Sequence, residues 1–141
     1  MTFQVTFDCA DPASLAAFWA EALGYELQGP PPGFASWPEF LAAQGVPEER
    51  WGSAAAIVDP KGKGPRIFFQ KVPEPKTVKN RVHLDLQSGG PLSDPIEVRR
   101  ARTDAEVARL EKLGATKVEA REDLGVYWVV MRDPEGNEFC V

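Results

Sequence analysis

The stretch FQVTFDCADPASLAAFWAEALGYEL, residues 3–27, decides the fold, because it reads as a strand followed at once by an amphipathic helix. Its first part, FQVTFD (3–8), alternates apolar and polar residues with the period of a strand that has one apolar face. Asp11 then stands at an N-cap position, with Pro12 at the first helical position. Apolar residues recur at helical spacing over 15–23, and the glycine that follows predicts the end of the helix.

The rest of the first half predicts three more strands. YELQ (25–28) reads as a strand, and SAAAIVD (53–59) and PRIFFQK (65–71) form two more around a turn-forming PKGKG. Residues 29–52 form an insertion rich in proline and glycine, with a short helix expected in PEFLAAQ (38–44). The first half therefore has the order βαβββ.

The second half predicts the same order. RVHLDLQ (81–87) alternates as a strand, and a helix follows the connection at 88–95, with Thr103 and Glu106 in capping-box spacing. DPEG, with Asp first, Pro second and Gly fourth, is typical of a type I turn. The strands expected after the helix are 116–120, 125–133 and 137–141.

The two halves also match position by position. FQVTFD lies over VHLDLQ in phase, so Gln4 corresponds to His83 and Thr6 to Asp85. DPKG in the first half likewise corresponds to DPEG in the second. A repeat of about 75 residues that keeps both order and phase indicates an α+β protein built from two tandem βαβββ modules.

The repeat and three motifs resemble the vicinal-oxygen-chelate superfamily, which includes glyoxalase I, extradiol dioxygenases, fosfomycin resistance enzymes and bleomycin-binding proteins. Within it, the chain looks like a glyoxalase-like domain. The motifs are DCADPASLAAFWAEALGYEL (8–27), VPEPKTVKNRVHLDL (72–86) and DPEGNEFCV (133–141). The resemblance implies that the two modules form a half-open barrel around a central cavity.

This resemblance also implies a domain organisation. We expect a single domain over 1–141, with module 1 at about 1–71, a linker at 72–79 and module 2 at about 80–141. Family members commonly pair modules within or between chains, so a homodimer is expected, and the sequence leaves the choice between these pairings open.

The family's metal ligands are a polar residue early in the first strand of each module and, usually, a glutamate on the last strand. The first-strand slots here are Gln4 and His83, and the last-strand slot of module 2 is Cys140. In module 1 the slot falls on Phe68 or, after a shift of two residues, on Gln70. Because neither last-strand slot is an acid, the sequence argues against the usual catalytic metal. A divalent ion held by Gln4, His83 and a Cys140 thiolate stays an alternative.

His83 could also act without a metal. Asp85 lies two residues on, about 7 Å away along a strand, so it could orient the imidazole or share a substrate proton. The structural alternatives are a hydrogen-bonded His83, an Asp85 that pairs with Arg81, and a Cys140 that is simply a buried thiol.

Two further groups suggest a ligand. The cations Lys71, Lys76, Lys79 and Arg81 could bind an anionic group or could form a solvated linker. The insertion carries several aromatic residues. Trp37 and Phe40 in its short helix could cover a ligand, or they could anchor the insertion to itself or to a partner.

The remaining aromatic side chains lie in regular elements. Phe18, Trp19 and Trp128 are predicted to belong to the core.

Composition excludes several classes. The net charge of −5 argues against a general nucleic-acid binder, and no apolar run approaches the roughly 20 residues of a membrane span. Two cysteines make no disulfide framework, and the N-terminus does not read as a signal peptide, so a cytoplasmic location is expected.

Two functions follow from these patterns. In the first, a cavity lined by Gln4, Thr6, His83, Asp85 and Cys140 binds a small organic molecule beneath the Trp37 and Phe40 lid, with Arg81 nearby, and without the usual metal. The alternative is a lyase, isomerase or dioxygenase of the glyoxalase I type, in which His83 and Asp85 are catalytic. The sequence does not name the ligand.

Overall fold

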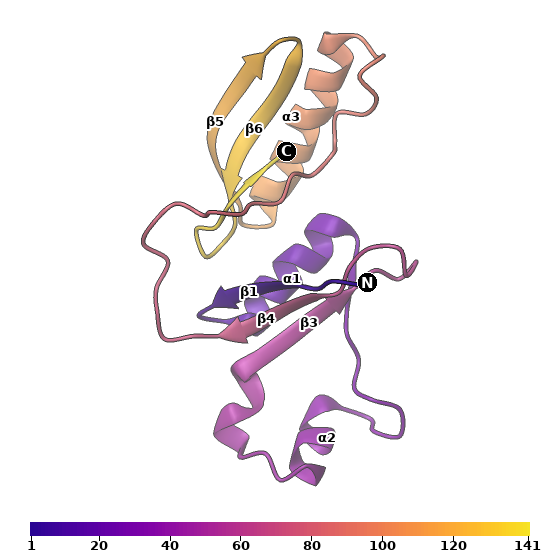
Figure 1. The fold of residues 1–141 in the computed structure, drawn as a ribbon, viewed down its shortest axis with the longest axis vertical. Coiled ribbons are helices and arrows are strands. Elements are labelled where there is room, and N and C mark those ends of the chain that lie inside the picture. The colour runs from indigo at the N-terminus through magenta and orange to yellow at the C-terminus, as the bar shows by residue number, and fades with distance from the viewer. The chain divides into compact units, whose positions relative to one another are not determined.

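A computed structural model describes all residues, 1–141, as two compact units, Met1–Pro75 and Lys76–Val141 (Figure 1). We describe each unit by itself. The elements of the first unit are β1 (Val5–Cys9), α1 (Pro12–Leu23), β2 (Glu26–Leu27), α2 (Trp37–Ala43), the 3-10 helix η1 (Glu48–Ser53), β3 (Ala54–Val58) and β4 (Ile67–Lys71). Those of the second are α3 (Ile96–Lys112), β5 (Thr116–Asp123), β6 (Val126–Arg132) and β7 (Glu138–Cys140).

The first unit is a sheet of order β1-β4-β3-β2 with α1 packed on one face. β1 pairs with β4 in parallel, and the other pairs are antiparallel. The ring of Phe7 lies 5.2 Å from that of Trp19 on α1 and 5.4 Å from that of Phe69. This aromatic group fills the space between helix and sheet, as the apolar stripe of the sequence predicts.

The caps of α1 confirm the local prediction. Asp11 accepts hydrogen bonds from Ser14, at 2.7 Å from Oγ and 3.1 Å from the backbone N–H. These bonds, the side-chain one first, hold the pKa of Asp11 below its ordinary value. At the other end Gly24 has φ +66°, a left-handed conformation that glycine adopts without steric cost.

The second unit is a sheet of order β5-β6-β7 with α3 on one face. Its core includes Val107 and Leu110 of α3, together with Val129, Met131 and Phe139 of the sheet. No helix of the structure has the length and hydropathy to span a membrane. The α+β class predicted from the repeat is confirmed by these two helix-on-sheet units.

The expected strand at 81–87 is wrong as a regular strand. Asp85 forms only an isolated parallel bridge with Cys140. Two hydrogen bonds define it, from Leu86 N–H to Cys140 O at 2.8 Å and from Cys140 N–H to Leu84 O at 2.9 Å. Because the partner strand β7 has three residues, whereas β4 offers five to β1, the ladder in the second unit has fewer backbone partners.

The capping box at Thr103 is also wrong. The helix begins seven residues earlier, at Ile96, directly after Pro95. Thr103 is 2% exposed inside the helix, where its hydroxyl accepts a hydrogen bond from Ser88 Oγ at 3.3 Å. The Thr-x-x-Glu spacing therefore occurs in mid-helix, where the backbone N–H groups already bond to the preceding turn.

The turns in DPEG and DPKG follow their residue chemistry, whereas the β5–β6 turn places a leucine at positive φ. The N–H of Gly136 donates to Asp133 O at 2.9 Å, which confirms the turn in DPEG, and Gly62 makes the same 2.9 Å bond to Asp59 in DPKG. In the β5–β6 hairpin the two connecting residues, Leu124 and Gly125, both have positive φ, +46° and +73°. Positive φ at both positions is the signature of a type I′ turn.

Candidate functional site

The second unit contains a hollow of about 650 Å³ beside its sheet. Val129 and Met131 are fully buried on the side of β6 that packs against α3. Since side chains alternate along a strand, Trp128, Val130 and Arg132 project from the other face, where they line the hollow.

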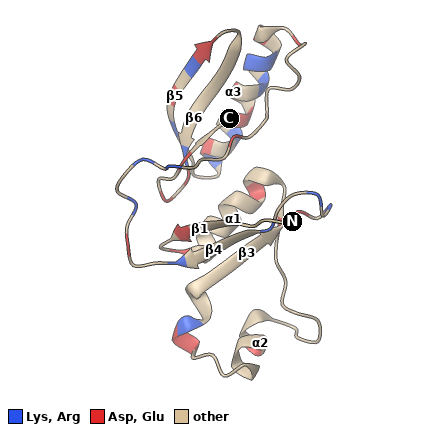
Figure 2. Cartoon of the chain, viewed as in Figure 1, with Lys and Arg blue, Asp and Glu red and all other residues tan.

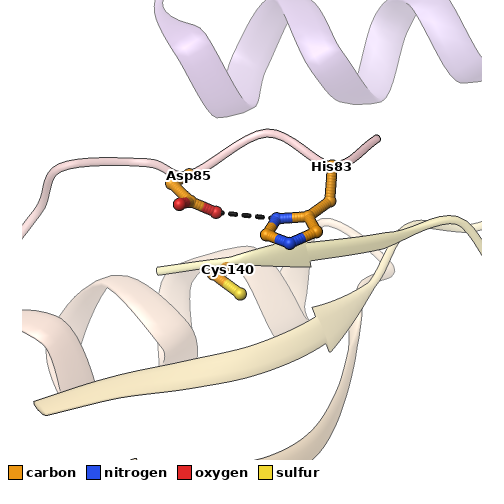
Figure 3. A group of neighbouring side chains, drawn as sticks. All are labelled: His83, Asp85 and Cys140. Atoms are coloured by element: carbon orange, nitrogen blue, oxygen red, sulfur yellow. Dashed lines mark hydrogen bonds and ion pairs between the residues drawn. The ribbon is translucent and has the colours of Figure 1, made fainter. Parts of the chain in front are cut away.

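His83, Asp85 and Cys140 meet in this hollow (Figure 3). His83 Nδ1 lies 2.9 Å from Asp85 Oδ1, and the donor atoms of all three residues lie within 4.8 Å of one another. The bridge between Asp85 and Cys140 places these two residues side by side. The structure therefore pairs Asp85 with His83 and not with Arg81.

The surroundings keep the Cys140 thiol protonated. Burial raises its pKa above the ordinary value, and the negative charge of Asp85 and a hydrogen bond to that carboxylate raise it further. The positive charges of Lys79 and Arg121 act in the opposite direction with smaller effect. At neutral pH the group is a thiol that can donate to Asp85, and it is not a ready nucleophile.

Glu138 of β7 fixes the segment that leads into the site. Its carboxylate accepts the backbone N–H of Asn80 at 3.0 Å and lies 3.2 Å from Lys76 Nζ. The bond from Asn80, with the contribution of Lys76 after it, lowers the pKa of Glu138 to about 2 against the opposing effect of burial. Lys76 of the predicted basic group therefore has a structural partner, whereas Lys79 lines the hollow.

Gln4 and Thr6 belong to the first unit, where they lie next to each other. Gln4 Nε2 donates to Thr6 Oγ1 at 3.4 Å, and Gln4 Oε1 accepts from Arg66 Nη1 at 2.5 Å. The oxygen proposed as a metal ligand is thus already bonded to a guanidinium, whose positive charge repels a cation.

A metal ion of the kind that the resemblance implies fits the residues around His83 in the second unit, but it does not fit those around Gln4 in the first. An imidazole nitrogen, a carboxylate oxygen and a thiolate sulfur are donors that zinc accepts. His83 and Asp85 supply the first two, and Cys140 would supply the third on losing its proton as the ion binds. The carboxylate missing from the last strand would then come from Asp85. Gln4 does not fit, because Arg66 occupies its oxygen.

The strand register identifies the counterpart of Cys140. Thr6 lies opposite Phe68 in the β1–β4 ladder, and Asp85 lies opposite Cys140 in the second unit. Because Thr6 and Asp85 correspond in the repeat, Phe68 and not Gln70 occupies the equivalent place. The first unit therefore has an aromatic ring where the second has a thiol.

The aromatic residues of the insertion contact one another. The ring of Phe40 lies 5.8 Å from that of Trp37 and 5.1 Å from that of Phe34, edge to face in both cases. Trp37 Nε1–H donates to Gln28 O at 2.8 Å, and no residue of α2 is buried. These contacts are those expected of the anchoring alternative, in which the aromatic residues hold the insertion together.

Sequence reasoning misplaced one aromatic residue and missed several cations. Phe18 and Trp19 are buried as predicted, but Trp128 is half-buried and lines the hollow. Arg121 and Arg132 line it too, whereas Arg81 is exposed outside it. Alternation within VYWVVMR could have separated the two faces, but both faces carry apolar residues, so the pattern does not say which one α3 covers. Figure 2 shows that acidic and basic residues both occur on α3 and β5.

Comparison with known proteins agrees with this fold. The sequence profile of a glyoxalase-like domain matches residues 4–141. No curated protein matches the chain.

Several solved structures share the fold. A glyoxalase/bleomycin resistance protein/dioxygenase family enzyme from Burkholderia phytofirmans PsJN has 17% identity and a TM-score of 0.59, over 97% of this chain and 93% of that one. Lactoylglutathione lyase from Agrobacterium tumefaciens has 14% identity and a TM-score of 0.56, over 100% and 91%. The fosfomycin resistance protein FosX from Listeria monocytogenes, in complex with Mn(II) and a dihydroxypropylphosphonic acid, has 11% identity and a TM-score of 0.60, over 99% and 88%.

Proposed function

Because the chain belongs to the glyoxalase-like domain family, we propose that it binds a small organic molecule in the hollow of its second unit. The observation that carries this proposal is the hollow itself, with its aromatic wall and one hydrogen-bonded polar pair. Its volume of about 650 Å³ lies within the range of small-molecule sites. Trp128 and the neighbouring valines supply an apolar wall, and His83 with Asp85 supplies the polar group.

The two polar residues have separate roles in this proposal. Asp85 accepts the Nδ1–H of His83 and so fixes the tautomer and orientation of the ring. The other ring nitrogen, Nε2, then accepts a hydrogen bond from a hydroxyl or N–H group of the ligand. Lys79 adds a positive charge beside the hollow, which favours a ligand with an anionic group.

The domain organisation and the oligomeric state are part of the same proposal. We propose that the two units act as the modules of one domain and that the protein forms a homodimer. Size-exclusion chromatography with light scattering measures the mass directly. Twice the 15.5 kDa of the chain supports the dimer, and the mass of one chain refutes it.

A thermal-shift screen tests the binding proposal. Purified protein is heated with a library of aromatic and anionic small molecules, and its metal content is measured in parallel. We expect metal-free protein whose midpoint rises with a subset of ligands, and we expect His83→Ala and Trp128→Ala to abolish that rise. Lys112→Ala, at the far end of α3, is the matched control and should keep it. Stoichiometric metal that is lost in His83→Ala would refute binding without a metal.

The grouping of His83, Asp85 and Cys140 within 4.8 Å favours a second candidate, an enzyme of the lyase, isomerase or dioxygenase type. When bound, a zinc-like ion would supply a Lewis acid, and these three residues would hold it. Metal analysis of Asp85→Asn and Cys140→Ser distinguishes the two functions. Stoichiometric metal in the wild type that falls in both variants supports the enzyme, and a wild type without metal after growth and purification with added zinc removes the metal-dependent form of it.

A further inference from the structure

Arg66 lies on the face of the first sheet that is opposite to α1. The neighbouring residues of β4, Ile67 and Phe69, are buried beneath α1, so alternation places Arg66 and Phe68 on the opposite face. The Arg66 side chain is half-buried, and its guanidinium carbon lies 5.1 Å from the centroid of the Phe68 ring.

None of the partners of this guanidinium is an acid. Arg66 Nε donates to Gln28 Oε1 at 2.7 Å, and Nη1 donates to Gln4 Oε1 at 2.5 Å. Both acceptors are neutral amide oxygens. Because a guanidinium has five N–H donors and these bonds use two, three donors are left for another partner, and no carboxylate among these partners neutralises the charge.

Other arginines of the chain pair with an acidic side chain. Arg100, Arg109 and Arg121 each form an ion pair with a glutamate. In the repeat, Arg66 stands two residues before Phe68, as Glu138 stands two before Cys140. Glu138 is neutralised by Lys76, so of these two equivalent positions only Arg66 has no opposite charge.

We infer that Arg66 binds the carboxylate of a small organic molecule on this face of the first unit. A planar guanidinium matches a carboxylate in geometry, and its single charge matches a monoanion, whereas a phosphate dianion would call for a second cation. Thr6 lies directly opposite Phe68 in the sheet register, and its hydroxyl, which accepts from Gln4, has its own proton to donate to the anion. The half-buried ring of Phe68 provides an apolar surface for the body of the ligand.

Every residue assigned to this site belongs to the first unit, and none of them lines the hollow of the second. The two amides have a defined role in the site. Gln4 and Gln28 each accept a hydrogen bond from the guanidinium and so fix its orientation before a ligand binds. This preorganisation lowers the entropy cost of binding.

The probes that test the inference are benzoate, its neutral analogue benzamide, and inorganic phosphate. Binding is followed by calorimetry and by ¹H–¹⁵N spectra of the whole chain. We expect benzoate to shift the backbone signals of Thr6 and Phe68 together with the Arg66 Nε–H signal, and we expect benzamide to leave these signals in place. Phosphate that binds more tightly than benzoate at the same signals would overturn the assignment to a carboxylate.

Substitutions at Arg66 give the second part of the test. Loss of a charged hydrogen-bonding group in Arg66→Gln should weaken benzoate binding about tenfold or more. Arg66→Lys, which keeps the charge and loses the planar fork, should weaken it severalfold and guards against an effect of misfolding. Arg50→Gln, an exposed arginine of the same unit, should bind like the wild type.

His83→Ala separates this inference from the proposed function. It should leave the benzoate shifts at Thr6 and Phe68 unchanged even where it abolishes binding in the hollow. Benzoate affinity at these signals that is the same in Arg66→Gln as in the wild type would overturn the inference, whatever the outcome for the hollow.

Discussion

Replacement of Glu138 by glutamine should destabilise the protein in a way that depends on pH. The pKa of Glu138 falls from an ordinary 4.5 to about 2 in the folded state, a change that corresponds to at most about 3 kcal/mol. The carboxylate side chain is 12% exposed and its partner Lys76 is 26% exposed, so solvent screening reduces this value. Glutamine also keeps an oxygen that can accept the N–H of Asn80. We therefore expect Glu138→Gln to cost about 1–2 kcal/mol at pH 7.

The sign of the pH effect follows from the lowered pKa. A carboxylate whose pKa is depressed on folding contributes its full stability above the unfolded value, near 4.5, and loses it as the pH falls towards 2. The difference in unfolding free energy between the wild type and Glu138→Gln should therefore shrink to less than half at pH 3. Urea unfolding at pH 7 and pH 3 measures this difference.

A matched control uses Glu74→Gln, an exposed carboxylate of the neighbouring linker, which should change the unfolding free energy little at either pH. An equal loss of stability in Glu138→Gln at pH 7 and pH 3 would refute the argument, because the loss could not then come from the charge that Asn80 and Lys76 stabilise.

Three further predictions concern the turns and the thiol. Leu124→Asn should raise the unfolding free energy by about 1 kcal/mol in urea, because asparagine accepts the left-handed conformation of a type I′ turn better than leucine does; an unchanged value contradicts this. Asp85→Asn should speed alkylation of Cys140 by iodoacetamide at pH 8 severalfold, as followed by peptide mass spectrometry, because it removes a charge and a bond that raise the thiol pKa; a slower reaction contradicts it. Gly64→Ala should lower the melting temperature with a cost of about 1 kcal/mol, because its Cβ would lie 1.8 Å from the hydroxyl oxygen of Tyr25. Tyr25→Phe in the same chain should restore part of the loss, and no restoration would point to another cause.

Local signals predicted the elements that depend on near neighbours. The start and end of α1 follow from Asp11, Pro12 and Gly24, and the structure places each as the sequence predicts. The in-phase repeat also led to the resemblance to the family, whose ligand positions fall on His83 and Cys140. These inferences succeed because caps, turns and periodicity act over a few residues.

Other features depend on partners distant in the chain. Residues 81–87 have the alternation of a strand, but the length of β7 decides how much of it pairs. Trp128 lies in a strand with apolar residues on both faces, so only the packing of α3 shows that it faces the hollow. The contacts of Arg66 with Gln4 and Gln28 leave no signal in the sequence, because they join residues up to 62 positions apart.

The sequence by itself determined the βαβββ order of the first unit, the capped first helix, the turns in DPKG and DPEG, and the resemblance to the family, since each rests on local chemistry repeated in order. Only the tertiary structure decided which side chains share a surface. It placed Asp85 beside His83 and Cys140, and it placed the Gln4 side-chain oxygen where Arg66 donates a hydrogen bond to it. The reason is physical: a strand fixes that side chains alternate, but the helix that covers one face and the strand that pairs at the edge decide which of them meet.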